Sequence, residues 1–201
     1  MEILVLATLL MAGYYLLKAR EQSQRIALLG QHLGQHQIEK LMENLTSGYL
    51  RALGEEDPER RTQIWSLLPT AEAELCTQFQ RFATGFAAVD PALTRVSTLP
   101  IAVPGATRLF PAATFDLRKA LAIHGHGIAQ VAGNAAGRSQ KDKAFMLTAE
   151  LFLMQHTCHW YCRSRAVASA RLLARHKTSW AQVLAAVSPE TRAAYRALTG
   201  C

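Results

Sequence analysis

The sequence predicts an all-α protein with a single N-terminal transmembrane helix followed by a helical-bundle body. The first observation is a run of fifteen uncharged, mostly apolar residues from Ile3 to Leu17. The second is the composition: 50% of the 201 residues are hydrophobic, 7% are aromatic, and no convincing run alternates apolar and polar residues with period two. Such a chain favours helices over strands and has enough residues for one buried core beyond the anchor.

The apolar run predicts a membrane anchor. Fifteen helical residues extend about 22 Å, against a hydrocarbon core of ~30 Å. Lys18 and Arg20 reduce the shortfall, because their aliphatic stems lie along the core while their charges reach the interface. Tyr14 and Tyr15 fit an aromatic belt. A cleaved signal peptide fits less well, since Glu2 stands where such a peptide carries cations. A buried helix of a soluble protein is the alternative.

Charge asymmetry predicts the orientation. Lys18, Arg20 and Arg25 follow the run, and the side of a span that is rich in Lys and Arg prefers the cytoplasm. We therefore expect the N-terminus outside and the body on the cytoplasmic side of the membrane, where the four cysteines stay reduced thiols. The expected division is a membrane anchor over residues 1–20, an amphipathic connecting helix over residues 21–54 and an α-helical body over residues 55–201.

Residues 18–53 carry apolar side chains at helical spacing but without a sustained heptad, which argues against a long coiled coil. His32 and His36 share one helical face and are a potential metal pair. A solvated Gln/His face is the preferred interpretation, because no acid or cysteine accompanies them. Gly30 and Gly34 predict a hinge here, since each glycine costs a helix about 1 kcal/mol relative to Ala.

Start and stop signals divide the next stretch into helices. Asp57 supplies an N-cap and Pro58 a first helical residue. We expect Pro69 to end this helix and Thr70 to cap a second helix that runs to about Ala88.

A second Asp-Pro pair at residues 90–91 starts a short helix that reaches about Val96. Residues 97–113 hold three prolines and a glycine, which predicts a loop, and the apolar side chains of this loop indicate that it covers the core of the bundle. Thr114 is then expected to cap a helix that begins at Phe115.

Residues 141–176 predict the longest helix of the body, apolar at its start and basic at its end, where cations suit the helix dipole. Glu150 lies in the apolar half, so a central core helix is favoured over a second membrane span. Ser179 precedes a shorter helix, and Ser188 caps a final helix that ends at Gly200.

One cluster of metal-type ligands lies on that long helix. Cys158, His159 and Cys162 fall within an arc of about 100°, and thiolate and imidazole are ligands that zinc prefers. An imidazole from His124 or His126 would complete a set of four. The C-x3-C spacing on a continuous helix differs from the usual C-x2-C zinc knuckle, so we predict no cofactor and keep zinc as the alternative. The competing interpretation is two buried cysteines with partly buried histidines.

The net charge of +7 is concentrated late in the chain. Residues 1–100 carry 9 basic and 11 acidic side chains, a balance of −2, whereas residues 141–201 carry 9 and 3, a balance of +6. Such a surplus suits anionic lipid or an acidic protein partner, and nucleic acid is a less favoured partner. The candidate anion-binding residues are Arg163, Arg165, Arg171, Arg175 and Lys177.

The sequence shows no catalytic carboxylate pair, no Ser-His-Asp arrangement and no nucleotide-binding fingerprint. It therefore favours a non-enzymatic role and reveals no specific activity. We expect a membrane-anchored accessory, assembly or interaction subunit of a membrane-associated complex, which binds a protein partner. Two alternatives stay open. One is a metal- or thiol-dependent enzyme that uses Cys158, His159 and Cys162, and the other is a binder of anionic lipid or nucleic acid through the basic C-terminal helices.

Overall fold

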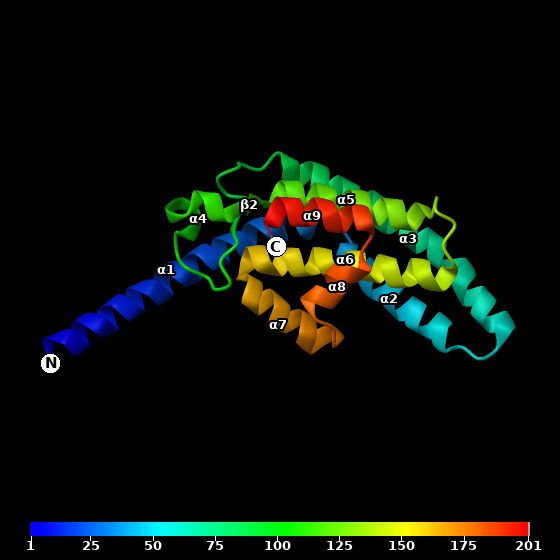
Figure 1. Cartoon of the computed structure of the whole chain (residues 1–201), viewed down its shortest axis with the longest axis horizontal. Coiled ribbons are helices and arrows are strands. Elements are labelled where there is room, and N and C mark those ends of the chain that lie inside the picture. The colour runs from blue at the N-terminus through cyan, green and yellow to red at the C-terminus, as the bar shows by residue number, and fades with distance from the viewer. Residues whose placement is uncertain (201) are drawn as a thin grey trace.

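The computed structural model describes residues 1–200 and confirms the all-α fold, with 78% of the chain in helices (Figure 1). The helices of this part are α1 (Glu2–Leu33), α2 (Ile38–Gly54), α3 (Pro58–Ala87), α4 (Ala106–Leu109), α5 (Leu117–Gly133), α6 (Gln140–Cys162), α7 (Arg165–His176), α8 (Trp180–Ala186) and α9 (Pro189–Thr199). Two three-residue strands, β1 (Arg95–Ser97) and β2 (Thr114–Asp116), form the remaining regular structure besides a short 3-10 turn at Pro111–Ala113.

Helix α1 has two halves with different surroundings. Its apolar N-terminal half projects away from the body (Figure 1), and the most apolar 18-residue window of the helix is 0% buried. Its second half packs against α3 and α6, where Leu29 is buried. By length and composition, α1 is the one helix within residues 1–200 that could cross a membrane.

The chain turns at one of the two hinge glycines. α1 ends at Leu33 with Gly34 as its C-cap, and α2 begins at Ile38. The predicted solvated Gln/His face is found in part: Gln31 and Gln35 are exposed, whereas His32 and His36 are half-buried, with ring centres 5.3 and 6.1 Å from those of Phe86 and Phe82. The predicted boundary at residue 20 lies inside α1 and that at residue 54 at the end of α2, and the three-part division stays a prediction.

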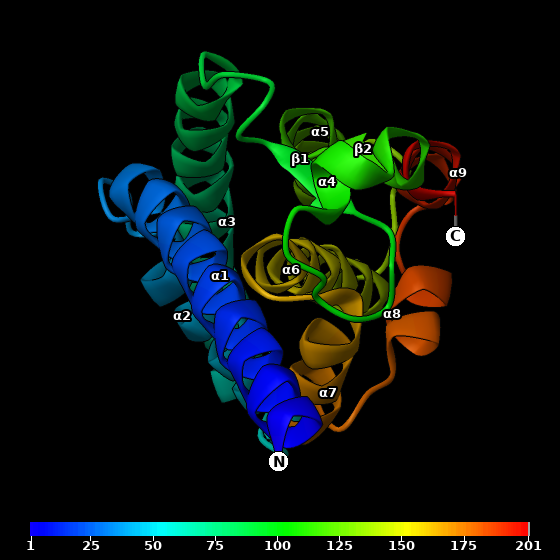
Figure 2. The same ribbon diagram turned by 90° about the vertical axis from the view of Figure 1, so that its left-hand side faces the viewer.

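Helix α6 is the central helix, as the sequence predicted. It lies in the middle of the bundle (Figure 2), where it contacts α1, α2, α5, α7 and α8. It buries Leu147, Leu151 and Trp160. The predicted continuous helix over residues 141–176 is wrong, however. α6 ends at Cys162, and Ser164 starts α7 by accepting a hydrogen bond from the Val167 backbone N–H at 3.3 Å. A capping serine competes well with helix continuation, and the chain bends there.

Two further elements differ from the expectations. Pro69 does not end a helix but lies inside the 30-residue α3, because Leu68 and the buried phenylalanines of α3 hold both sides of the proline against the bundle.

The short helix expected before Val96 is absent. β1 instead pairs antiparallel with β2, with Val96 opposite Phe115, and Asp116 rather than Thr114 caps α5.

The last two helices begin at the serines that were predicted to cap them. Ser179 forms a capping box with Gln182 at the start of α8, and Ser188 accepts a hydrogen bond from the Thr191 backbone N–H at the start of α9. Gly200 ends α9 in the left-handed conformation, with φ of 70°. Together with α6, these helices enclose a second, smaller hydrophobic cluster that contains Val183 and Tyr195.

Candidate functional site: a groove with an apolar floor and a basic rim

An open groove with a volume of about 360 Å³ lies between the second half of α1, the start of α2, α6 and α7. Its floor is apolar, because α1, α2 and α6 turn hydrophobic side chains toward it. The floor residues are Leu29, Ile38, Met42, Met154 and Cys158. We call this feature the α1–α6 groove.

The predicted thiol and imidazole ligands all line this groove. Cys158 and Cys162 are one turn apart on α6, and His159 lies between them in sequence. Burial raises the pKa of the Cys158 thiol far above its usual range and that of Cys162 to about 11. Burial and the nearby Arg171 lower the pKa of His159. At neutral pH both thiols are therefore protonated, which is the opposite of a reactive thiolate.

The proposed fourth zinc ligand does not reach this cluster. His124 is fully buried and its Nε2 atom lies 2.9 Å from the Thr157 hydroxyl, while His126 is exposed on the surface of α5. Within residues 1–200, no three His, Cys, Asp or Glu side chains are arranged to hold a metal ion. Cys76, Cys158 and Cys162 are free thiols. The zinc alternative stays a prediction.

The bend between α6 and α7 decides which cations reach the groove. Arg163 and Arg171 lie at its rim, and an Arg171 guanidinium nitrogen is 3.3 Å from Nδ1 of His159. Arg175 joins Arg171 and His159 around an adjoining hollow of about 390 Å³. Glu39 is the only carboxylate among the residues that line the groove. Three of the predicted anion-binding residues thus collect on one surface.

The other two predicted cations lie elsewhere. The Arg165 guanidinium lies 5.7 Å from the ring centre of Trp160, at the corner between α6 and α7. Lys177 ends α7 in the left-handed conformation, with φ of 54°. Arg165 is the first residue of α7 and Lys177 its C-cap, so these two cations lie at the ends of the helix, whereas Arg171 and Arg175 lie within it.

Sequence reasoning missed the contribution of the second half of α1 and the start of α2 to this site. Ile26, Leu29 and Met42 belong to a stripe with clear helical spacing, but local periodicity does not say which distant helix the stripe faces.

No protein-family model, curated protein or solved structure matches this chain. The chemistry of the groove itself is therefore the basis for its interpretation.

Proposed function

We propose that this chain is a single-span membrane protein whose body binds a partner protein through the α1–α6 groove, as an accessory or assembly subunit of a membrane-associated complex. The observation that carries the proposal is the combination of an apolar floor and a basic rim in one open groove. The partner segment that this surface fits is an amphipathic helix with an apolar face and an acidic face.

Membrane attachment is supported by the exposed half of α1. Twelve large hydrophobic side chains between Met1 and Leu17 are exposed, and they are spread around the helix rather than along one face. A helix that is apolar all round requires lipid or protein around it. Lys18, Arg20 and Arg25 at its inner end support a cytoplasmic body.

The partner helix is acidic because the rim is basic and largely unneutralised. Arg171 and Arg175 take part in none of the ion pairs formed within residues 1–200. Carboxylates of a docked helix would pair with these guanidinium groups, while its apolar face covers Leu29 and Met42. The protonated thiols that line the groove contribute to this binding as small hydrophobic groups.

Photo-crosslinking in native membranes tests this proposal. A photoreactive residue at Ile26, which is exposed at the groove, should form an adduct with one protein, and the crosslinked peptide should come from an acidic amphipathic helix. The same group at Leu50, which is exposed on α2 and does not line the groove, should form no such adduct. Arg171→Glu should abolish the Ile26 adduct.

The proposal is overturned by equal adducts at both positions, by an adduct that survives Arg171→Glu, or by a crosslinked peptide without acidic residues. Adducts to lipid alone would support the lipid-binding alternative. Restoration of the adduct by a basic substitution in the acidic helix would show direct charge pairing.

A further inference from the structure

The loop between β1 and α4 is held firmly against the base of the anchor. The Tyr14 hydroxyl donates a hydrogen bond to the Ala102 carbonyl at 2.8 Å, and the Gly105 backbone N–H donates to Glu21 at 3.1 Å. At the other side of the loop, the Trp160 indole donates to the Ser97 carbonyl at 2.9 Å. The loop therefore lies alongside α1 between Tyr14 and Glu21.

This attachment places the loop at a defined depth, if α1 crosses a membrane as proposed above. Tyr14 lies four residues before Lys18, which is about 6 Å along the helix toward the bilayer centre. The tip of the loop then reaches the level of the membrane interface. Ile101 in this loop and Leu109 and Phe110 at the end of α4 are each at least half exposed, and α4 lies at the end of the body from which α1 projects (Figures 1 and 2). Exposed apolar side chains at that depth are suited to the interface.

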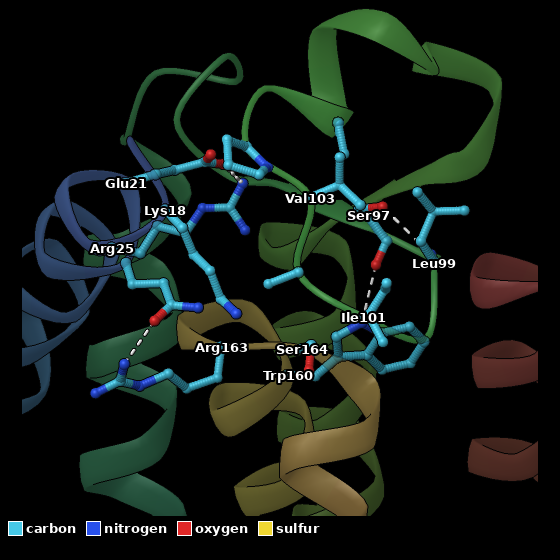
Figure 3. Close-up of a pocket in the computed structure, with 14 residues that line it drawn as sticks. Lys18, Glu21, Arg25, Ser97, Leu99, Ile101, Val103, Trp160, Arg163 and Ser164 are labelled. Atoms are coloured by element: carbon cyan, nitrogen blue, oxygen red, sulfur yellow. Dashed lines mark hydrogen bonds and ion pairs between the residues drawn. The ribbon is translucent and has the colours of Figure 1, made fainter. Parts of the chain in front are cut away.

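A small cationic hollow lies behind this loop. Lys18 and Arg25 line it from α1, and Arg163 lines it from the α6–α7 corner (Figure 3). Glu21 is the single carboxylate among the lining residues, and it is engaged by Arg25 at 2.6 Å and by the Gly105 N–H. Three cations against one anion leave a local balance of +2. In Figure 3 the Lys18 side chain extends into this space.

The size of the hollow restricts its ligand. Its volume of about 30 Å³ is enough for only one or two water-sized groups. A whole soluble metabolite does not fit, whereas the oxygens of a phosphate can enter while the rest of the molecule stays outside. Arg163 donates to Gln22 through one nitrogen, which leaves other guanidinium N–H groups for a phosphate.

We propose that this corner is a second membrane contact, in which Ile101, Leu109 and Phe110 enter the bilayer interface and Lys18 and Arg163 bind the phosphate of an anionic phospholipid. The phosphate is expected to belong to a lipid rather than to a soluble molecule. The reason is that the exposed apolar residues, the cationic hollow and the end of the anchor lie at the same depth relative to the membrane. The site is separate from the α1–α6 groove except for Arg163, which lines both. The inference rests on the membrane span of the proposed function and not on the partner protein.

Full-length protein in nanodiscs tests the phosphate contact. Nanodiscs of phosphatidylcholine with phosphatidylglycerol should give protein that retains phosphatidylglycerol after detergent extraction, as seen by native mass spectrometry. Lys18→Gln with Arg163→Gln should reduce this retention, by about fivefold for each charge removed. Arg60→Gln with Arg61→Gln removes the same charge from exposed positions on α3 and should leave retention unchanged. Equal loss in both double variants would overturn the proposal, and displacement of the lipid by millimolar inorganic phosphate would show a free-phosphate site instead.

A second measurement reports the depth of the end of α4. Brominated lipid should quench the fluorescence of a tryptophan introduced by Leu109→Trp, measured as the difference from the parent chain. It should not quench the fluorescence of a tryptophan introduced by Leu67→Trp on α3. If the protein enters nanodiscs but the tryptophan at position 109 is not quenched, this inference is overturned, while the membrane span of the proposed function is not. Protein that fails to enter nanodiscs at all would instead overturn the membrane span of the proposed function.

Discussion

Buried polar side chains connect α6 to its neighbours and set the protonation states there. The Thr157 hydroxyl lies 2.9 Å from both His124 on α5 and Tyr195 on α9. His156 bonds to the Ser169 hydroxyl of α7 at 3.1 Å. Burial lowers the pKa of both histidines to about 3. Both are therefore neutral at pH 7, and their rings serve as hydrogen-bonding parts of the core.

The lowered pKa of His156 predicts a pH dependence of stability. Between the unfolded pKa of about 6.5 and the folded pKa of about 3, the unfolded chain binds more protons than the folded chain, so stability falls as pH falls. Well inside this window one such group contributes about 1.4 kcal/mol per pH unit. The unfolding free energy, measured by urea denaturation in detergent, should differ between pH 5.5 and pH 4.5. In His156→Gln this difference should be smaller by about 1.4 kcal/mol than in the parent chain. His126→Gln, at an exposed position on α5, is the control that should not change it.

The protonated thiols of the α1–α6 groove make a second prediction at this scale. With a pKa of about 11, Cys162 should react with iodoacetamide at pH 7.5 at least about tenfold more slowly than a free cysteine of pKa ~8.5, because less of it is thiolate. Peptide mass spectrometry resolves this rate for Cys162 alone, and urea should restore the normal rate. A rapid reaction in the folded protein would contradict the burial argument and favour the thiol-enzyme alternative.

The candidate site could be predicted in part from the sequence. Cys158, His159 and Cys162 were recognisable because their shared face depends only on spacing within one helix. Arg163 and Arg171 were recognisable as cations, but their place at the rim depends on the bend at Ser164. Pairings between distant helices, such as Met42 with Cys158 across the groove, depend on tertiary packing that no local pattern specifies.

At the scale of elements, the serine caps of α8 and α9 were predictable, whereas the cap of α5 and the interruptions were not. Ser179 and Ser188 mark their helices because an N-cap is a local hydrogen bond. Pro69 was assigned as a helix end, although packing on both sides of it retains one helix. Three-residue strands leave no period-two pattern, so β1 and β2 could be recognised only through their pairing.

The contact of α5 with α6 and α9 depends on one glycine. A Cβ atom at Gly127 would lie 2.2 Å from the Thr191 hydroxyl and 2.7 Å from a Glu150 carboxylate oxygen. We expect Gly127→Ala to destabilise the protein by about 1–3 kcal/mol, because overpacking forces the helices apart. Thermal or urea unfolding in detergent measures this change.

Gly85→Ala on α3 is the matched control for Gly127→Ala. No neighbouring atom lies within 4 Å of a Cβ built at Gly85. The variant should be neutral or more stable by up to about 1 kcal/mol, because alanine favours the helix. If Gly127→Ala were equally harmless, the close approach of α5 to α6 and α9 would be contradicted.

At the scale of the whole molecule, α1 connects the proposed membrane anchor to the α1–α6 groove. The helix is unbroken from Glu2 to Leu33, so its exposed apolar half and its packed half keep a fixed relation. Leu29 in the groove floor is twelve residues beyond Leu17, which corresponds to about 18 Å along the axis. A partner helix in the groove would therefore lie near the membrane surface, where a subunit of a membrane complex would meet it.

The proposed membrane span of α1 makes the final prediction, because one substitution has different costs in lipid and in water. Leu10 lies at the centre of the apolar run, and an arginine at the centre of a span costs about 2.5–3.5 kcal/mol on insertion scales. Leu67 on α3 is similarly exposed, at 73% against 67% for Leu10, but it belongs to the body. Leu10→Arg should move the protein from the carbonate-resistant membrane fraction to the soluble or aggregated fraction, whereas Leu67→Arg should leave it in the membrane. Equal behaviour of the two variants would show that α1 does not cross a bilayer.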